Sequence, residues 1–359
     1  MARPTVCLNM IVKDEAPVIA ECLRSVKPLI DAWLICDTGS TDTTREVIRH
    51  ELRGLPGEVV DRPWKHFGHN RSEALELARG RADYLLFLDA DETLEVPEGY
   101  RWPRLTAEAY GLQKRRGGHL YQLPALVRAD LPWRWEGVVH EYLTLGRTPR
   151  TEALPGVVIA SERRGVRTRD PHTFRRDALL LEAALLDDPT DARSAFYLAQ
   201  SYRDADDLDN AVRWYEHRAT MGGWHEEVFV SALQAARCRQ RRGDPWPEVL
   251  AALLLAHDVD PRRAEPLHDI GVRALEQKQH ATGELFFGRA ASLPMPPPHA
   301  LFVEVEVYAW RAKLNHAVCL YWLGRKAEAA AINEALLAQA GLPDHARKLA
   351  EENLGYCRG

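Results

Sequence analysis

Apolar and polar positions alternate in short blocks along the first ninety residues, and these blocks are of two kinds. Short runs of apolar residues are typical of strands that are buried on both faces of a sheet. Each run is followed by a segment in which apolar residues recur with helical spacing. The predicted strands are 6–11, 33–36, 58–61 and 84–88, and the predicted helices are 16–29, 43–52 and 72–79.

Alternation of strands and helices with short loops predicts an α/β domain with a mostly parallel, Rossmann-like sheet and helices on both faces. Ligands of such sheets bind beyond the carboxyl ends of the strands. Asp37 ends the second predicted strand, and Asp89 and Asp91 directly follow the fourth. We therefore expect these three carboxylates to share one crevice.

The pattern changes near Pro171, where strand signals vanish and the sequence becomes rich in Ala and Leu with helical spacing. Four segments align on one frame, each with a small residue early in one helix and an apolar patch about a dozen residues later. The small residues, spaced 37, 35 and 46 positions apart, are Ala199, Ala236, Gly271 and Ala317. This pattern resembles the tetratricopeptide repeat, whose period is about 34 residues. An ordinary helical bundle is the alternative.

We therefore expect two domains, an α/β domain over residues 1–168 and an all-α, tetratricopeptide-like domain over residues 169–359. The proline-rich stretch 294–298 lies in the longest gap between repeats and is expected to interrupt the stack.

The charge and the cysteine content of the sequence limit which partners and which cellular compartment we expect. The net charge is -5 and the pI is near 6.3, which gives no general attraction to nucleic acid or to anionic membranes. No segment approaches the roughly 18 uninterrupted apolar residues of a transmembrane helix. The six cysteines show neither a CxxC pair nor metal-ligand spacing, so we expect reduced, mostly buried thiols in a cytoplasmic protein.

Three interpretations compete for the acidic run Asp89-Ala90-Asp91. The first is a turn or helix cap, because Asp often follows strands. The second is a Mg²⁺ site for phosphoryl transfer, but the glycine-rich GxxxxGK[ST] loop that normally accompanies it is missing from the sequence. The third is a metal–diphosphate site of an enzyme that uses a nucleotide sugar, since hard divalent cations take carboxylate oxygens and bridge phosphates.

The flanking blocks favour the third interpretation. VCLNMIVKDEAPVIAECLRSV, ICDTGSTDTT and FGHNRSEALELARGRADYLLFLDADE resemble the family 2 glycosyltransferases of the GT-A fold, and the resemblance covers residues 4 to about 100. It implies that Asp37 accepts a hydrogen bond from a uracil ring and that Arg71 faces the nucleotide. Ser72 stands where the family usually has Asn. It also implies further contacts to the donor, from Val12, Lys13, Glu15, Asp89 and Ala90.

By the same resemblance, Asp89 and Asp91 hold a divalent cation, Mn²⁺ or Mg²⁺. The segment LPWRWEGVVHEYL, residues 131–143, resembles the W-x-G-x-x-H-E block of bacterial family 2 enzymes that carry tetratricopeptide repeats. This likeness implies that Trp133 and Trp135 stack on a sugar or peptide. His140 would complete the metal shell, and Glu141 would act as general base, with the acid at Asp91 as the next candidate. The alternative is that both tryptophans are packing residues that join the domains and that His140 is a core histidine.

The resemblance implies an inverting, metal-dependent transferase with a nucleotide-sugar donor, most commonly a UDP-sugar. Repeats of this kind commonly hold extended peptide, so the expected acceptor is a peptide or protein side chain of Ser, Thr or Cys, as in enzymes that modify bacteriocin-type peptides. One alternative is a saccharide or lipid-linked glycan acceptor, with the repeats forming a homodimer. Another is a non-catalytic scaffold that binds nucleotide sugar or peptide. The basic stretch 162–170 is either a solvated linker or a lid over the diphosphate.

Overall fold

The computed structural model describes residues 3–116, 119–161, 165, 170–297 and 300–359. The chain forms two compact units that divide between Asp187 and Asp188. The domain boundary expected between residues 168 and 169 lies outside the described residues.

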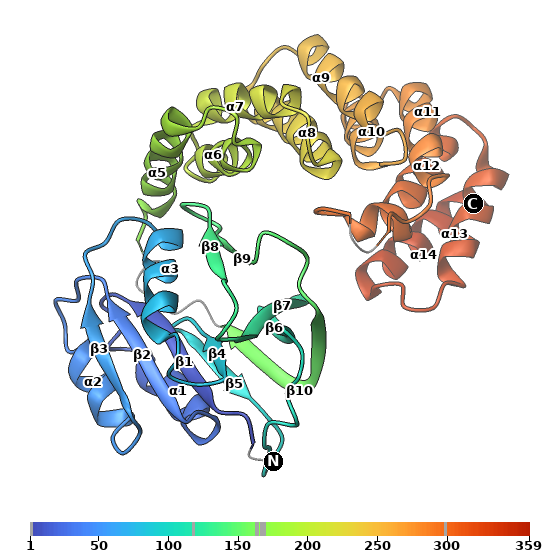
Figure 1. Ribbon diagram of the computed structural model, residues 1–359. Coiled ribbons are helices and arrows are strands. Elements are labelled where there is room, and N and C mark those ends of the chain that lie inside the picture. The colour runs from blue at the N-terminus through green and yellow to red at the C-terminus, as the bar shows by residue number, and fades with distance from the viewer. Residues whose placement is uncertain (1–2, 117–118, 162–164, 166–169, 298–299) are drawn as a thin grey trace. The chain divides into compact units, whose positions relative to one another are not determined.

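The described part of the first unit contains an eight-stranded sheet (Figure 1). Its first half consists of β1 (Val6–Val12), β2 (Ala32–Asp37), β3 (Gly57–Asp61) and β4 (Tyr84–Phe87), which pair in parallel in the order β3-β2-β1-β4. The apolar runs predicted these four strands to within a few residues of their ends. The α/β fold class with a mostly parallel sheet is confirmed.

Helices cover both faces of this parallel half. Successive side chains of a strand point to opposite faces, so Leu8 and Met10 of β1 pack with α1 (Ile19–Val26) and α2 (Thr44–Glu51). Cys7 of the same strand packs on the other face, against α3 (Phe67–Ala78). Helix α3 begins five residues before the predicted start, because the His66 side chain caps it by accepting a hydrogen bond from the His69 amide.

The second half of the sheet is not among the predicted strands. It is formed by β5 (Glu92–Glu95), β6 (Ala109–Arg116), β7 (His119–Arg128) and β10 (Thr151–Ser161), and it completes the order β4-β7-β6-β10-β5. Three of its pairings are antiparallel, while β6 and β10 pair in parallel. A separate hairpin consists of β8 (Arg134–Glu136) and β9 (Tyr142–Thr144).

The first unit ends with α5 (Thr173–Asp187), and the second unit is helical. Within its described residues, four helical pairs follow the four predicted repeats. They are α6 (Ala192–Asp204) with α7 (Leu208–Thr220), α8 (His225–Arg242) with α9 (Trp246–Val259), α10 (Glu265–Glu276) with α11 (His280–Ala291), and α12 (Ala312–Trp322) with α13 (Lys326–Leu337). A last helix, α14 (Asp344–Arg358), packs on α13.

The small residues of the predicted repeats lie in the interior of the helical unit. Ala199, Ala236 and Ala317 are buried, and a β-carbon at Gly271 would lie 2.7 Å from the Phe287 ring. At Gly271 this close approach leaves no room for a larger side chain. The six cysteines, all within the described residues, are free, and five of them are buried. No described helix is both long and apolar enough to cross a membrane.

Candidate active site

The loops that follow β1 and β2 are tied together by side-chain hydrogen bonds. Asp14, at φ 54°, accepts from the amides of Thr41 and Asp42, and the Asp14 amide donates to Ser40 Oγ. Val12 is buried, and its carbonyl accepts from the Thr38 amide at 2.9 Å, while Lys13 is exposed. The first predicted donor block therefore lies at the carboxyl ends of the two central strands.

Asp37 lies at the end of β2 and is buried. Its Oδ1 accepts from the amides of Gly39 and Ser40 and from Arg45 Nη2 at 3.0 Å. Burial raises the pKa of Asp37, but these hydrogen bonds outweigh it and hold the pKa at about 2. Oδ2 is buried and has no hydrogen-bond partner among the residues that the structure describes. An ionised oxygen without a donor is the acceptor that a nucleobase N–H requires.

The acidic run after β4 forms a tight turn. The Asp89 amide donates to Glu92 Oε2 at 3.0 Å, and the Glu92 amide donates to the Asp89 carbonyl at 3.1 Å. Ala90 is buried within the turn, whereas the Asp89 side chain is partly exposed. Lys114 of β6 forms an ion pair with the buried Glu92 carboxylate. Burial and the charge of Asp89 raise the pKa of Glu92, and Lys114 opposes this rise.

Arg71 of α3 joins two acids at this turn. Its Nη2 lies 2.5 Å from Asp89 Oδ1, and its Nε lies 2.7 Å from Glu141 Oε1. Burial lowers the pKa of Arg71, but Asp89 and Glu141 raise it overall. The guanidinium carbon lies 5.2 Å from the centre of the Trp135 ring. Three predicted site residues, Arg71, Asp89 and Glu141, are thus brought together from separate segments.

The β8–β9 hairpin delivers Glu141 to Arg71 because it is docked on α3. Ser72 Oγ donates to the Trp135 carbonyl and accepts from the Trp135 amide. The Phe67 amide donates to the Val138 carbonyl, and a β-carbon at Gly68 would lie 2.2 Å from the Gly137 oxygen. Ser72, which departs from the usual Asn, therefore ties α3 to the hairpin.

The two loop residues His140 and Glu141 have different surroundings. His140 has φ 54° and is exposed, whereas the Glu141 carboxylate is largely buried against Arg71. No three His, Cys, Asp or Glu side chains in the described residues form a metal-binding group. The predicted set of Asp89, Asp91 and His140 is therefore not formed in this structure, because the turn directs His140 to solvent.

The predicted role of Trp133 also needs correction. Trp133 is 1% exposed and its indole N–H donates to the Arg128 carbonyl, so its ring is inaccessible to a sugar or a peptide. Trp133 is a packing residue. Trp135 packs edge-on against Phe87 beneath Arg71 and is half-buried. Its indole nitrogen is buried and has no hydrogen-bond partner within the described part of the chain.

Glu15 and Asp91 approach one point beside Gly165. A β-carbon there would lie 3.2 Å from Asp91 Oδ2 and 3.3 Å from Glu15 Oε1, and the Gly165 amide donates to Asp91 Oδ2. Of the basic stretch expected to be a linker or lid, the structure describes Gly165 and Asp170 alone. Cations of the Mg²⁺ type are usually held by one or two carboxylates together with substrate phosphates. The oxygen donors Glu15, Asp89 and Asp91 fit such a shared site, whereas they do not make an all-protein cage.

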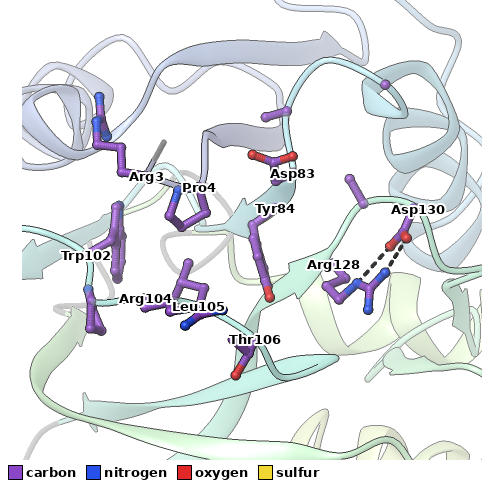
Figure 2. Close-up of a pocket in the computed structure, with 14 residues that line it drawn as sticks. Arg3, Pro4, Asp83, Tyr84, Trp102, Arg104, Leu105, Thr106, Arg128 and Asp130 are labelled. Carbon is purple, nitrogen blue, oxygen red and sulfur yellow. Dashed lines mark hydrogen bonds and ion pairs between the residues drawn. The ribbon is translucent and has the colours of Figure 1, made fainter. Parts of the chain in front are cut away.

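A cavity of about 830 Å³ lies elsewhere (Figure 2). It is lined by residues at the amino ends of β1 and β4, among them Pro4, Asp83 and Tyr84, together with Trp102 and the Arg128–Asp130 ion pair. The acids described above follow the carboxyl ends of these strands. The cavity is therefore separate from the candidate active site.

Comparison with known protein families matches the segment that contains most of the candidate site. The model of the family "Glycosyl transferase family 2" matches residues 7–105. This segment is similar to family 2 glycosyltransferase domains. The match includes the loops after β1 and β2, Arg71 and the turn after β4, whereas Glu141 lies outside it.

Two curated relatives match different shares of the chain. A TPR repeat-containing protein of Synechococcus elongatus is 29% identical over 264 residues, which is 68% of this chain and 63% of the relative. The prophage-derived glycosyltransferase SunS of Bacillus subtilis is 32% identical over 89 residues, 24% of this chain and 20% of SunS. The chain thus spans less than two thirds of either relative.

Two solved structures are similar at low sequence identity. S. aureus TarS 1-349 in complex with UDP-GlcNAc is 13% identical, covers 66% of this chain and 87% of that chain, and has a TM-score of 0.38. The crystal structure of MamA is 12% identical, covers 51% of this chain and 94% of that chain, and has a TM-score of 0.37.

Three residues of the site escaped the sequence analysis. Arg45 is the second residue of α2 and contacts both Asp37 and Asp61, which the parallel register of β2 and β3 places side by side. Glu92 and Lys114 meet only because the second half of the sheet brings β5 near β6. Glu92 directly follows the acidic run in the sequence and could have been recognised there, but its partner Lys114 could not.

Proposed function

We propose that the first unit transfers a sugar, with inversion, from a nucleotide-diphosphate sugar to a side chain of a peptide or protein. The observation that carries the proposal is the cluster of Arg71, Asp89 and Glu141 beyond the carboxyl end of β4. Two of these residues belong to the segment that matches family 2. A UDP-sugar is the proposed donor, because Asp37 offers Oδ2 as a buried acceptor for an N–H of the base.

In this proposal different residues of the crevice bind the nucleoside, the diphosphate and the metal ion. Val12, Lys13 and Glu15 lie along the nucleoside and diphosphate, and Asp37 orients the base. Arg71 lies beside the leaving diphosphate, where a fixed positive charge stabilises the charge that develops during transfer. A Mn²⁺ or Mg²⁺ ion, when bound by Asp91 and Asp89, would neutralise the diphosphate further.

Glu141 is the proposed general base. A base must lie within hydrogen-bond reach of the acceptor hydroxyl, and the Glu141 carboxylate already lies beside Arg71 at the rim of the turn. Oε1 is engaged by Arg71, which fixes the orientation of the carboxylate. A thiol acceptor would need this base less, because part of it is ionised near neutral pH.

The proposed acceptor class follows from the helical repeats. Stacked helical pairs form an extended surface that suits an extended peptide, and a repeat-containing relative aligns over 68% of this chain. A saccharide or lipid-linked glycan acceptor is the second candidate, with the repeats used for self-association. A pulldown with the full chain, comparing immobilised Ser-, Thr- and Cys-containing peptides with immobilised glycans, separates the two.

The donor part of the proposal is tested by thermal unfolding of the full chain with a panel of nucleotide sugars, with and without Mn²⁺. We expect a UDP-sugar to raise the unfolding temperature, and Mn²⁺ to increase the rise. Asp37→Asn should reduce the effect of the nucleotide. A panel in which no nucleotide sugar changes the unfolding temperature would remove the basis of the proposal.

A further inference from the structure

A buried ion pair lies beneath the turn that carries Asp89 and Asp91. Its members are Glu92, the first residue of β5, and Lys114 of β6, with side chains that are 4% and 16% exposed. Strand β10 lies between β5 and β6, and it pairs Ile159 with both Lys114 and Leu94. Because Glu92 lies two residues before Leu94, Glu92 and Lys114 face the same side of the sheet.

Glu92 fixes the backbone of Asp89 from both sides. Its carboxylate accepts from the Asp89 amide at 3.0 Å, and its amide donates to the Asp89 carbonyl at 3.1 Å. Cys22 of α1 donates a further, weaker hydrogen bond from Sγ to the same carbonyl at 3.4 Å. Glu92 therefore holds the backbone of the turn, while Arg71 holds the Asp89 side chain.

The Glu92 carboxylate in turn depends on Lys114. An unpaired buried carboxylate is strongly unfavourable, and removal of one partner of a buried ion pair is far more damaging than removal of both. The negative charges of Asp89 and Asp91 are close in sequence and make an unpaired Glu92 less favourable still. Lys114 supplies the compensating charge from β6.

We propose that Lys114 is a positioning residue for the donor site: through Glu92 it fixes the Asp89–Asp91 turn in the orientation that binds a metal-bound nucleoside diphosphate. The inference rests on the proposed function, because it assumes that this turn meets the donor. Lys114 acts here without touching the donor, since its ammonium group is engaged by Glu92 on the inner side of the turn.

The test uses double substitution in the full chain, with UDP as the probe and calorimetry in either Mn²⁺ or EDTA. Lys114→Met leaves the Glu92 carboxylate buried and unpaired, so we expect Mn²⁺-dependent UDP affinity to fall about 10- to 100-fold, as for other residues that orient metal ligands. UDP affinity in EDTA should change little, because Asp37 and the β1 loop are untouched. A general structural defect would lower both affinities.

Glu92→Gln combined with Lys114→Met removes both charges but keeps an amide oxygen that can accept from the Asp89 amide. We expect this double variant to regain Mn²⁺-dependent affinity to within about threefold of the unchanged chain, and to fold even if Lys114→Met alone does not. Arg115→Met is the matched control, because Arg115 is the next residue of β6 and pairs with Glu95 at the surface. It should leave both affinities unchanged.

Two outcomes would overturn the inference. They are unchanged Mn²⁺-dependent affinity in Lys114→Met, and a double variant as weak as Lys114→Met. The second would indicate that Lys114 contacts the diphosphate directly. If the unchanged chain binds none of UDP, GDP and dTDP with Mn²⁺, the proposed function itself fails, which is a distinct result.

Discussion

Arg71 Nε donates to Glu141 Oε1 across 2.7 Å, and this contact joins residues that are seventy positions apart. The second arm of the same guanidinium reaches Asp89. Arg71 thus holds the proposed general base beside the acidic turn and links the β8–β9 hairpin to the candidate active site. The predictions below follow from this arrangement.

Replacement of Arg71 should impair turnover strongly. Arg71→Ala leaves Asp89 and Glu141 without their shared counter-charge and removes the fixed cation beside the diphosphate, so we expect turnover to fall about 10²- to 10³-fold. Arg71→Lys keeps the charge but cannot contact both carboxylates in the same way, so it should recover only part of the loss. Arg81→Ala is the control, because Arg81 pairs with Glu58 away from the turn. Equal turnover in the Arg71→Ala and Arg81→Ala variants would contradict this role.

Glu141→Gln should separate binding from chemistry. The amide can still accept from Arg71, so donor affinity should stay nearly unchanged, whereas turnover on a hydroxyl acceptor should fall about 10²- to 10⁴-fold. The loss should be smaller with a cysteine acceptor at slightly alkaline pH. The control is Glu136→Gln in the same hairpin, where Glu136 pairs with Arg134 and accepts from Tyr142. Steady-state kinetics with both acceptors measure the effect. Full turnover of the Glu141→Gln variant on a hydroxyl acceptor would show that another residue is the base.

A methyl group at Gly68 should disturb Glu141 from a distance. The added β-carbon would lie 2.2 Å from the Gly137 oxygen, so the hairpin must move away from α3. A displacement of about 1 Å at a catalytic group can reduce turnover about 10²-fold, and we expect Gly68→Ala to show such a loss with the donor affinity less affected. Gly355→Ala in α14, where no atom lies within 4 Å of the added carbon, is the control. Full turnover in Gly68→Ala would show that the hairpin position does not matter.

Asp37 should make stability depend on acid pH. Its folded-state pKa of about 2 lies below the ordinary 3.8, so its contribution to the free energy of unfolding is complete above pH 3.8 and is lost as the pH falls towards 2. The difference in unfolding free energy between the unchanged chain and Asp37→Asn should therefore be constant from about pH 7 to pH 5 and shrink below about pH 4. Urea titrations at each pH measure this difference, with Asp61→Asn as the exposed control. A difference in unfolding free energy that stayed constant down to about pH 3 would contradict the prediction.

The parallel half of the fold was predictable because its strands are continuous apolar runs. The antiparallel half was not, because β6 carries Gln113, Lys114 and Arg115 in sequence and β7 contains Pro124. Pro124 pairs with Gly111 where the register of β6 and β7 shifts, an irregularity that accommodates a residue without an amide donor. Local pattern gives no indication of such a pairing.

The candidate site was predictable to the same extent. Asp37, Asp89 and Asp91 follow strand ends, so the parallel sheet alone places them at one edge. The Arg71–Glu141 contact depends on how the hairpin docks on α3, which no local pattern encodes. The same docking explains the corrections: Trp133 precedes β8 and is buried, and His140 lies in a turn with φ 54° that exposes its ring.

Release of nucleoside diphosphate from a nucleotide sugar, measured with an acceptor peptide present, tests the central claim most directly. Samples would compare the full chain in Mn²⁺, the full chain in EDTA, and Asp91→Ala in Mn²⁺, with intact-mass analysis of the peptide. We predict release from a UDP-sugar together with a peptide heavier by one sugar residue, and loss of both in EDTA and in Asp91→Ala. A folded chain that releases no diphosphate from any nucleotide sugar, or Asp91→Ala acting as well as the unchanged chain, would contradict the account.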